Sequence, residues 1–303
     1  MKPKSAQVIG IDLGGTAIKL GLFEADGSCT QSLTVATPQP ATPEAVLTAI
    51  LNAISQITAP VESWSAIGVG LPGPVDGTGR ISQVAINLDN WRDVPLADWL
   101  EEKTQKPVIM ANDANCAGLG EAWLGAGRDF DNLIMLTLGT GVGGAIILNR
   151  QLFVGHRGAA GELGLITLNP DGPPCNSGNQ GSLEQYVSVQ AIGRETGNKP
   201  SDLAQKAIAG DPQALAYWEQ YGRRLGAGLA SLIYILTPEA VILGGGISAA
   251  ANLFLPTLWG EIQRRVLPTS REGLQIFTAE LGNQAGTIGA ARLAFQKFGW
   301  EET

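Results

Sequence analysis

Two glycine-rich segments are the residues best suited to chemistry in this chain of 303 residues. They read Gly10-Ile-Asp-Leu-Gly-Gly-Thr-Ala-Ile-Lys19 and Thr137-Leu-Gly-Thr-Gly-Val-Gly-Gly-Ala-Ile146. The flanking β-branched and aliphatic residues predict a strand, a tight turn and a returning strand in each segment. Glycine lets the backbone approach a ligand closely and turn successive N–H groups toward one point, which suits phosphate oxygens. The pair therefore predicts a duplicated fold that holds a nucleotide between its halves.

Several carboxylates stand where they could act on such a ligand. Asp12 lies beside the first turn and could hold Mg²⁺, because hard cations take oxygen ligands. Asn112 and Asp113 follow a predicted strand, at the position that ligand groups usually occupy in α/β sheets. Asp113 has two interpretations: it caps the next helix, or it accepts the proton of a hydroxyl that attacks the terminal phosphate.

Two glutamates leave a similar choice open. Glu162 lies in the glycine-rich run Gly158–Leu165, and Glu184 begins a helix after a turn. Each is either a helix-terminal charge or an acceptor of hydrogen bonds from sugar hydroxyls. A polar group left unpaired by a wrong ligand costs about 1–3 kcal/mol, so such carboxylates would also set specificity. His156, the only histidine, follows Gly155 in a loop and is predicted to be a surface residue.

Composition narrows the class of protein. The net charge of −8 and the isoelectric point near 4.8 argue against binding to nucleic acid or to a membrane surface. The three cysteines are far apart and odd in number, which favours a reducing cytoplasm over a disulfide framework. No secretory signal is expected near Met1, and the apolar stretch Leu225–Leu236 is too short for a membrane span. That stretch is predicted to be a buried helix.

Apolar periodicity then predicts the elements that position these residues. In the first half we expect strands at 8–12, 18–24, 32–37, 66–70 and 108–110, and helices at 42–58, 96–102 and from 114. In the second half we expect strands at 132–138, 143–148, 151–154, 240–243 and 275–279, and helices at 188–196, 201–209, 212–236, 254–266 and 285–298. The predicted domains are 1–116, with the C-terminal helix 285–303 packed back on it, and 117–284. The hinge is expected near 115–120.

An ordered set of motifs over nearly the whole chain resembles the ROK family of bacterial sugar kinases, and within it the glucokinases. The motifs are Asp12–Thr16, Gly70-Leu-Pro-Gly-Pro-Val-Asp76, Asn112-Asp113, Gly139-Thr-Gly-Val-Gly-Gly144, Gly161-Glu-Leu-Gly164, Leu183-Glu184, Ile242-Leu-Gly-Gly-Gly246 and Gly282-Asn-Gln-Ala-Gly-Thr-Ile-Gly289. The resemblance implies an α/β, actin-like ATPase (ribonuclease H-like) fold, with two duplicated α/β domains around a cleft that closes on a hexose and on ATP with Mg²⁺.

The resemblance also implies roles for individual residues. Asp113 would be the catalytic base toward the sugar 6-hydroxyl. Asn112, Glu162 and Glu184 would bind the sugar, with Asn87 a weaker candidate. The phosphate side would be formed by Asp12, Gly14, Gly15, Thr16, Lys19, Thr140 and Gly141, and Gly245 would lie near the adenosine.

One part of the family pattern is missing. ROK proteins usually carry a histidine and three cysteines that hold a structural Zn²⁺, and here the corresponding positions are Leu165, Cys175, Ser177 and Ser182. One thiolate cannot form the closed tetrahedral site of structural zinc, so we expect no structural zinc and no metal ligands of that kind. The family histidine also touches the sugar, and Leu165 removes that hydrogen bond.

The leading hypothesis is ATP-dependent phosphorylation of glucose at O6. The alternatives are a ROK kinase for mannose, fructose or an N-acetylhexosamine, a sugar-responsive repressor, and a catalytically inactive sugar sensor. ROK repressors carry an N-terminal helix-turn-helix, whereas the first phosphate strand here begins at Val8. ROK kinases are often dimers or tetramers, so a homodimer is a further expectation.

Overall fold

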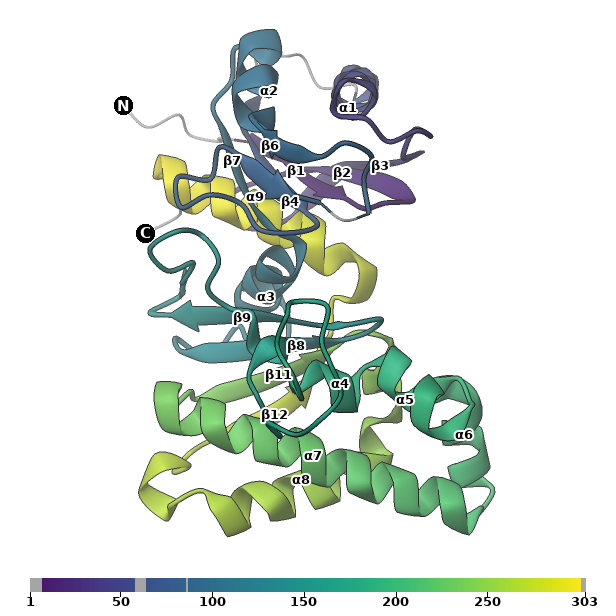
Figure 1. The fold of residues 1–303 in the computed structure, drawn as a ribbon. Helices are drawn as coiled ribbons and strands as arrows, with labels where there is room; N and C mark the ends of the chain where they lie inside the picture. The colour runs from purple at the N-terminus through teal and green to yellow at the C-terminus, as the bar shows by residue number, and fades with distance from the viewer. Residues whose placement is uncertain (1–6, 58–63, 86, 301–303) are drawn as a thin grey trace. The chain divides into compact units, whose positions relative to one another are not determined.

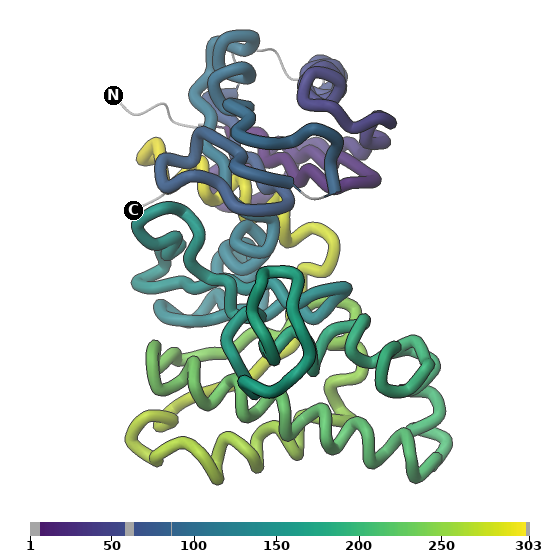
Figure 2. The backbone as a smooth tube through the Cα atoms, in the orientation of Figure 1, coloured from purple at the N-terminus to yellow at the C-terminus, as the bar shows by residue number. Residues whose placement is uncertain are grey.

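The computed structural model describes residues 7–57, 64–85 and 87–300 (Figures 1 and 2). Their contacts form two compact units. The first contains Met1–Asp129, Ala145–Gly161 and Asn283–Thr303, and the second contains Phe130–Gly144 and Glu162–Gly282. The predicted domains 1–116 and 117–284 stay a prediction; the compact units group residues 117–129 and 145–161 with the first unit.

A five-stranded sheet in the order β3-β2-β1-β4-β7 forms the centre of the first unit (Figure 1). The strands are β1 (Gln7–Leu13), β2 (Ala17–Phe23), β3 (Cys29–Ala36), β4 (Trp64–Leu71) and β7 (Val108–Asn112). β1 is antiparallel to β2 and parallel to β4, and β4 is parallel to β7. The carboxyl ends of these three parallel strands therefore share one edge, where ligand groups of α/β sheets gather.

Helices cover both faces of this sheet. α1 (Pro43–Gln56) and α2 (Leu96–Thr104) pack on one face, against a core that includes the β1 side chains Ile9 and Ile11. α9 (Ala285–Phe298) packs against β1 and β4, and α3 (Asp113–Leu124) packs against α9. The alternation of side chains along β1 explains this arrangement, because residues two apart point to the same face.

Glycines let α9 lie directly on the sheet. A Cβ at Gly68 in β4 would lie 1.8 Å from the carbonyl oxygen of Ala290, and a Cβ at Gly10 in β1 would lie 2.2 Å from that of Thr287. Gly289 meets α3 in the same way, since a Cβ there would lie 1.6 Å from the carbonyl oxygen of Cys116. These contacts join backbone to backbone, so a larger residue cannot be accommodated by a side-chain rotation.

The second sheet has the strand order β10-β9-β8-β11-β12. Its strands are β8 (Leu133–Leu138), β9 (Val142–Leu148), β10 (Gln151–Leu152), β11 (Ala240–Gly244) and β12 (Gln275–Thr278). The helices of the second unit are α4 (Glu184–Val187), α5 (Val189–Thr196), α6 (Pro200–Ile208), α7 (Pro212–Leu236) and α8 (Ala251–Arg265). α7 packs on α8 around the aromatic rings of Trp218, Tyr221 and Phe254, whose centroids lie 5.0–5.9 Å apart.

Several expectations from the sequence differ from the structure. A short antiparallel hairpin of β5 (Ser82–Val84) and β6 (Arg92–Val94) was not predicted. Trp91 lies just before this hairpin's second strand and is 3% exposed; its indole N–H donates to Ser82 Oγ at 2.7 Å and can therefore be buried. Residues 115–120, the predicted hinge, lie within the continuous helix α3.

The predicted buried helix at 225–236 is wrong in its last turn. Tyr234 is 47% and Ile235 is 74% exposed, because only one face of α7 packs against neighbouring elements. The predicted helix at 254–266 begins earlier, at Ala251. The predicted end of the first helix, Thr58, and the N-terminal residues near Met1 lie outside the described residues. Within the described ranges, no helix combines the length and the apolar character that a bilayer span requires.

Candidate active site

The first glycine segment forms the predicted hairpin between β1 and β2. Its turn is closed by the N–H of Gly14, which donates to the carbonyl oxygen of Ala17 at 2.9 Å. Thr37, at the end of β3, supports the turn because its hydroxyl donates to the carbonyl oxygen of Gly14 at 2.6 Å. Thr16 is exposed at the tip of the turn. The hairpin is therefore held from behind while its tip stays open to a ligand.

Asp12 and Lys19 face each other across this hairpin. They are directly paired residues of β1 and β2, and Lys19 Nζ lies 3.0 Å from Asp12 Oδ2. The start of α9 is adjacent, because a Cβ at Gly286 would lie 2.9 Å from Asp12 Cγ and Lys19 Nζ reaches the carbonyl oxygen of Asn283 at 3.4 Å. Asp12 supplies carboxylate oxygens, the ligand type that Mg²⁺ prefers, so this residue fits a magnesium ion bound with a nucleotide.

At the end of β7, Asn112 is the N-cap of α3. Its Oδ1 accepts hydrogen bonds from the N–H groups of Ala114 at 2.9 Å and Asn115 at 3.3 Å. Its Nδ2 donates to the carbonyl oxygen of Gly73 at 3.2 Å, which ties the helix to the loop after β4. Gly73 lies in a motif that the sequence already singled out, but its partner could not be read from the sequence.

Asp113 is the first residue of α3 and not its N-cap. Its Oδ1 accepts from the N–H of Ala114 at 2.8 Å, and the side chain is exposed on one side. The protein that surrounds the rest of the carboxylate excludes water, and this burial raises the pKa of Asp113 above its ordinary value. The negative charge of Asp12 raises the pKa as well, while the Ala114 N–H opposes the shift. A carboxylate with a raised pKa is a better proton acceptor, so the electrostatics suit a general base.

Asn87, the weaker sugar candidate, is exposed in a turn beside the first hairpin. A Cβ at Gly15 would lie 3.3 Å from the carbonyl oxygen of Asn87. The structure therefore places the backbone of Asn87 next to the first hairpin. In the first unit the hairpin residues and Asn87 form one group, and Asn112 with Asp113 form another at the end of β7.

The second glycine segment forms the turn between β8 and β9, where the N–H of Gly139 donates to the carbonyl oxygen of Gly141 at 3.0 Å. Glu184, the first residue of α4, reaches this turn: its Oε2 accepts from the N–H of Val142 at 2.9 Å. A Cβ at Gly141 would lie 2.5 Å from the same oxygen, so only glycine leaves room for this carboxylate. Thr140 is exposed at the turn.

The two remaining candidate site residues of the second unit are Glu162 and Gly245. Glu162 is exposed and precedes the 3₁₀ helix Leu163–Leu165. Gly245 follows β11 with a φ of +82°, and a Cβ there would lie 2.3 Å from the carbonyl oxygen of Leu138. Backbone geometry alone therefore requires glycine at Gly245, whether or not a nucleotide lies beside it.

Comparison with known proteins identifies the family of the chain. The model of the ROK family matches residues 8–297. The chain belongs to the ROK family. It is 36% identical to a glucokinase of Halalkalibacterium halodurans, over 95% of each chain. A ROK family glucokinase of Streptomyces griseus, solved with glucose and AMPPNP, superposes with a TM-score of 0.77 at 36% identity over 96% of this chain and 100% of the other. A ROK hexokinase of Thermus thermophilus has a TM-score of 0.85 at 34% identity over 97% and 99% of the two chains. The ROK fold of these relatives is the actin-like ATPase fold, and the two five-stranded sheets described above agree with it.

This ROK protein holds its 167–182 loop by hydrogen bonds. Pro174 and Gln180 form an antiparallel bridge, and the N–H of Cys175 donates to the carbonyl oxygen of Asn179 at 2.8 Å. Asn179 Nδ2 in turn donates to the carbonyl oxygen of Leu165 at 2.9 Å. Burial raises the pKa of the Cys175 thiol, but hydrogen bonds led by that of Ser177 outweigh it, so the pKa lies below its ordinary value. In the part of the chain that the structure describes, no cluster of three or more histidine, cysteine or acidic side chains could hold a metal ion.

Proposed function

We propose that this ROK protein is an ATP-dependent hexose kinase that phosphorylates glucose at O6. The observation that carries the proposal is Asp113, a carboxylate with a raised pKa at the first turn of α3, next to the N-cap Asn112. The glucokinases to which the chain is similar over nearly its whole length support the choice of glucose and ATP.

In this reaction Asp113 accepts the proton of the glucose 6-hydroxyl as O6 attacks the γ-phosphorus of ATP. The O6–P bond forms, the bond between the γ-phosphorus and the bridging oxygen breaks, and ADP leaves with that oxygen. The protein mainly positions the reactants and balances charge in such a transfer. Lys19 and the backbone of the two glycine turns would bind the phosphates, and Gly245 would lie near the adenosine.

The remaining roles are proposals of the same kind. Asn112, Glu162 and Glu184 would bind sugar hydroxyls, with Asn87 a weaker candidate. Asp12 would hold Mg²⁺, which would neutralise charge on the transferring phosphate. The carboxylate of Glu184 is oriented for this role by the Val142 N–H, which leaves its other oxygen for a ligand.

The preferred hexose needs a separate test, because the aliphatic side chain of Leu165 stands where most ROK kinases have a histidine. We test it with a coupled assay of ADP release across glucose, mannose, fructose and N-acetylglucosamine. The expected result is the highest kcat/KM with glucose. A higher kcat/KM with another hexose would favour the alternative substrate, and no ADP release with any sugar would contradict a kinase.

We also propose that the enzyme works in the cytoplasm as a homodimer. Cys29, Cys116 and Cys175 are free thiols, which suits a reducing compartment. The homodimer rests on the family resemblance alone. Light scattering after gel filtration tests it, and a mass of one chain would contradict it.

A further inference from the structure

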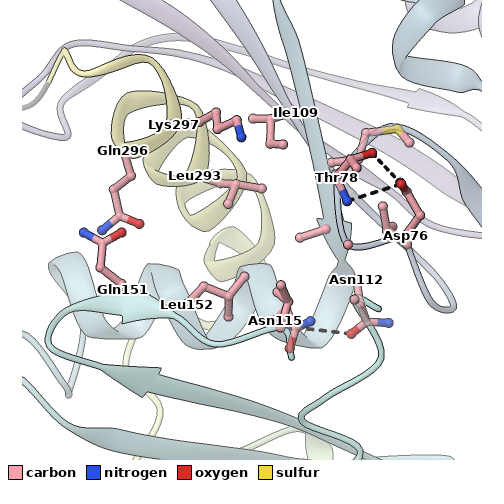
Figure 3. A pocket seen from close by; sticks show the side chains of 17 residues that line it. Asp76, Thr78, Ile109, Asn112, Asn115, Gln151, Leu152, Leu293, Gln296 and Lys297 are labelled. Carbon is pink, nitrogen blue, oxygen red and sulfur yellow. Dashed lines mark hydrogen bonds between the residues drawn. The ribbon is translucent and has the colours of Figure 1, made fainter. Parts of the chain in front are cut away.

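A pocket of about 370 Å³ opens in the first unit, away from the glycine hairpin (Figure 3). It lies among the loop after β4, the end of β7, β10 and the last turns of α9. Figure 3 shows Gln151 and Gln296 at one end, Asp76 and Thr78 at the other, and Asn112 and Asn115 along one side. None of the roles proposed above, apart from that of Asn112, uses this pocket.

Asn115 is the clearest sign that the pocket is made for a polar ligand. Its side chain lines the pocket and is 3% exposed, and its Oδ1 accepts no hydrogen bond from the described residues. A buried amide oxygen without a partner destabilises the free protein, and a hydroxyl group of a bound ligand would satisfy it. The amide group of Gln151 and the amide oxygen of Gln296 offer further hydrogen bonds, while Gln296 Nε2 donates to the carbonyl oxygen of Arg150 at 2.8 Å.

Two charged side chains, Asp76 and Lys297, line the pocket. Asp76 keeps its negative charge, and both of its carboxylate oxygens are occupied because they accept from the N–H groups of Thr78, Arg80 and Ile81. Lys297 lines the pocket and forms no ion pair with any residue within the described ranges. One ammonium group without a carboxylate partner selects a ligand that carries negative charge.

The volume of the pocket and its apolar side chains narrow the class of ligand further. Leu293 and Leu152 lie between the polar ends, as Figure 3 shows. Ligand pockets usually measure about 300–1,000 Å³, so this one is at the small end and suits a monosaccharide. We propose that this pocket binds a monosaccharide-sized, hydroxyl-rich anion, with the anionic group at Lys297 and hydroxyl groups at Asn115, Gln151 and Gln296.

A ligand bound in the pocket would affect the first turn of α3, in which Asn115 is hydrogen-bonded to the N-cap. The N–H of Asn115 donates to Asn112 Oδ1 at 3.3 Å, and Asn112 caps the helix that begins at Asp113. A ligand that engages Asn115 therefore changes the apparent affinity for the sugar substrate. This consequence, unlike the binding itself, rests on the proposed kinase function.

Isothermal titration of the full chain at saturating glucose tests the binding, because glucose occupies the substrate site. The probes are glucose 6-phosphate, a sugar phosphate, and gluconate, a sugar acid; sorbitol is the neutral control. The variants are Lys297→Gln and, as a matched control, Lys103→Gln; Lys103 is an exposed lysine on α2 that pairs with Glu102. Both changes are on the surface and leave the fold intact.

We expect at least one anion to bind wild type and Lys103→Gln alike, and to bind Lys297→Gln about tenfold more weakly, since the lost contact is charge-assisted. Sorbitol should bind more weakly than the anion. Which probe binds decides between a phosphate and a carboxylate. The proposal fails if neither anion binds wild type, or if Lys297→Gln binds as wild type does. The comparison of Lys297→Gln with Lys103→Gln measures binding and not catalysis, so the two proposals fail separately.

Discussion

At the scale of single residues, the structure separates two roles that the sequence left to one position. Asn112 caps α3 through its Oδ1, so the carboxylate of Asp113 is not needed as the cap. Asp113 accepts a hydrogen bond from the N–H of Ala114, and burial raises its pKa above the ordinary value. A carboxylate that is costly to ionise and open to solvent on one side is typical of a catalytic group.

Replacement of Asp113 by asparagine tests this role. Asn is nearly isosteric and can still accept from the Ala114 N–H, so the fold and the binding of glucose should persist. Without a proton acceptor, kcat should fall by about 10²–10⁴-fold, as measured by ADP release. The exposed Asp129→Asn serves as the control and should keep the wild-type rate. A near-normal kcat in Asp113→Asn would contradict the assignment.

The raised pKa of Asp113 also predicts two pH effects. As the pH falls through this pKa the carboxylate is protonated and cannot accept a proton, so kcat/KM should fall with a midpoint above the ordinary aspartate value of about 3.9. Stability changes in the opposite direction: the folded state holds this proton more tightly than the unfolded state, so the contribution of Asp113 to stability is lost as the pH rises through the raised pKa.

Both effects are checked by measuring kcat/KM and thermal unfolding of wild type and Asp113→Asn over the range of roughly pH 4 to 8, in which an aspartate with a raised pKa titrates. The wild type should lose melting temperature relative to the variant as the pH rises. An acid limb at or below the ordinary aspartate value, with intact folded protein, would argue against Asp113 as the base.

At the scale of elements, α9 connects the sheet of the first unit to α3. It lies on β1 and β4 with backbone contacts that only Gly10 and Gly68 allow, and it meets α3 at Gly289. The same helix begins beside Asp12, at Gly286. Its packing therefore positions both α3, which carries Asp113, and the surroundings of Asp12.

Gly68→Ala should destabilise the first unit, because the new Cβ would lie 1.8 Å from the carbonyl oxygen of Ala290 and the helix must shift. Overpacking of this kind costs about 1–3 kcal/mol. Urea unfolding followed by circular dichroism measures the loss. Gly193→Ala is the matched control: it lies in helix α5 with nothing within 4 Å of its added Cβ, and it should be neutral or stabilising. Equal stability of both variants would show that α9 does not lie as described.

At the scale of the whole molecule, the departure from the zinc pattern of the ROK family predicts how the protein responds to chelators. A structural zinc supplies about 10–16 kcal/mol of apparent binding free energy, so a protein that depends on it unfolds when it is removed. Here the loop that would surround the metal is closed by the bridges between Pro174 and Gln180 and between Thr167 and Ser182.

We therefore expect EDTA, with Mg²⁺ in excess, to leave both the melting temperature and the kinase activity unchanged. Elemental analysis after dialysis should find far less than one zinc per chain. Stoichiometric zinc, or a fall in melting temperature that added Zn²⁺ reverses, would mean that Cys175 has recruited ligands other than those of the family pattern.

The sequence by itself determined most of the order of strands and helices, though not the hairpin of β5 and β6, and it determined the positions of both glycine turns. These features depend on local signals: β-branched runs, the Thr42 N-cap, and glycines where a chain must turn, all of which act over a few neighbouring residues. Helix boundaries for α7 and α9 agree with the prediction to the residue, because Pro212 and Gly299 mark their ends. The ordered motifs also sufficed to indicate the ROK family.

Only the tertiary structure decided which of these residues meet. The contact of Glu184 with Gly141 and Val142, the burial of Trp91 against Ser82, and the pocket that Asn115 and Lys297 both line all join positions whose spacing carries no signal. Such contacts arise when separate elements pack, and their energies depend on the burial and pairing of each polar group in the folded chain. A local sequence pattern contains no information on burial or on pairing. The sequence could therefore name Asp113 as a candidate base, but its raised pKa depends on the protein packed around it and on Asp12.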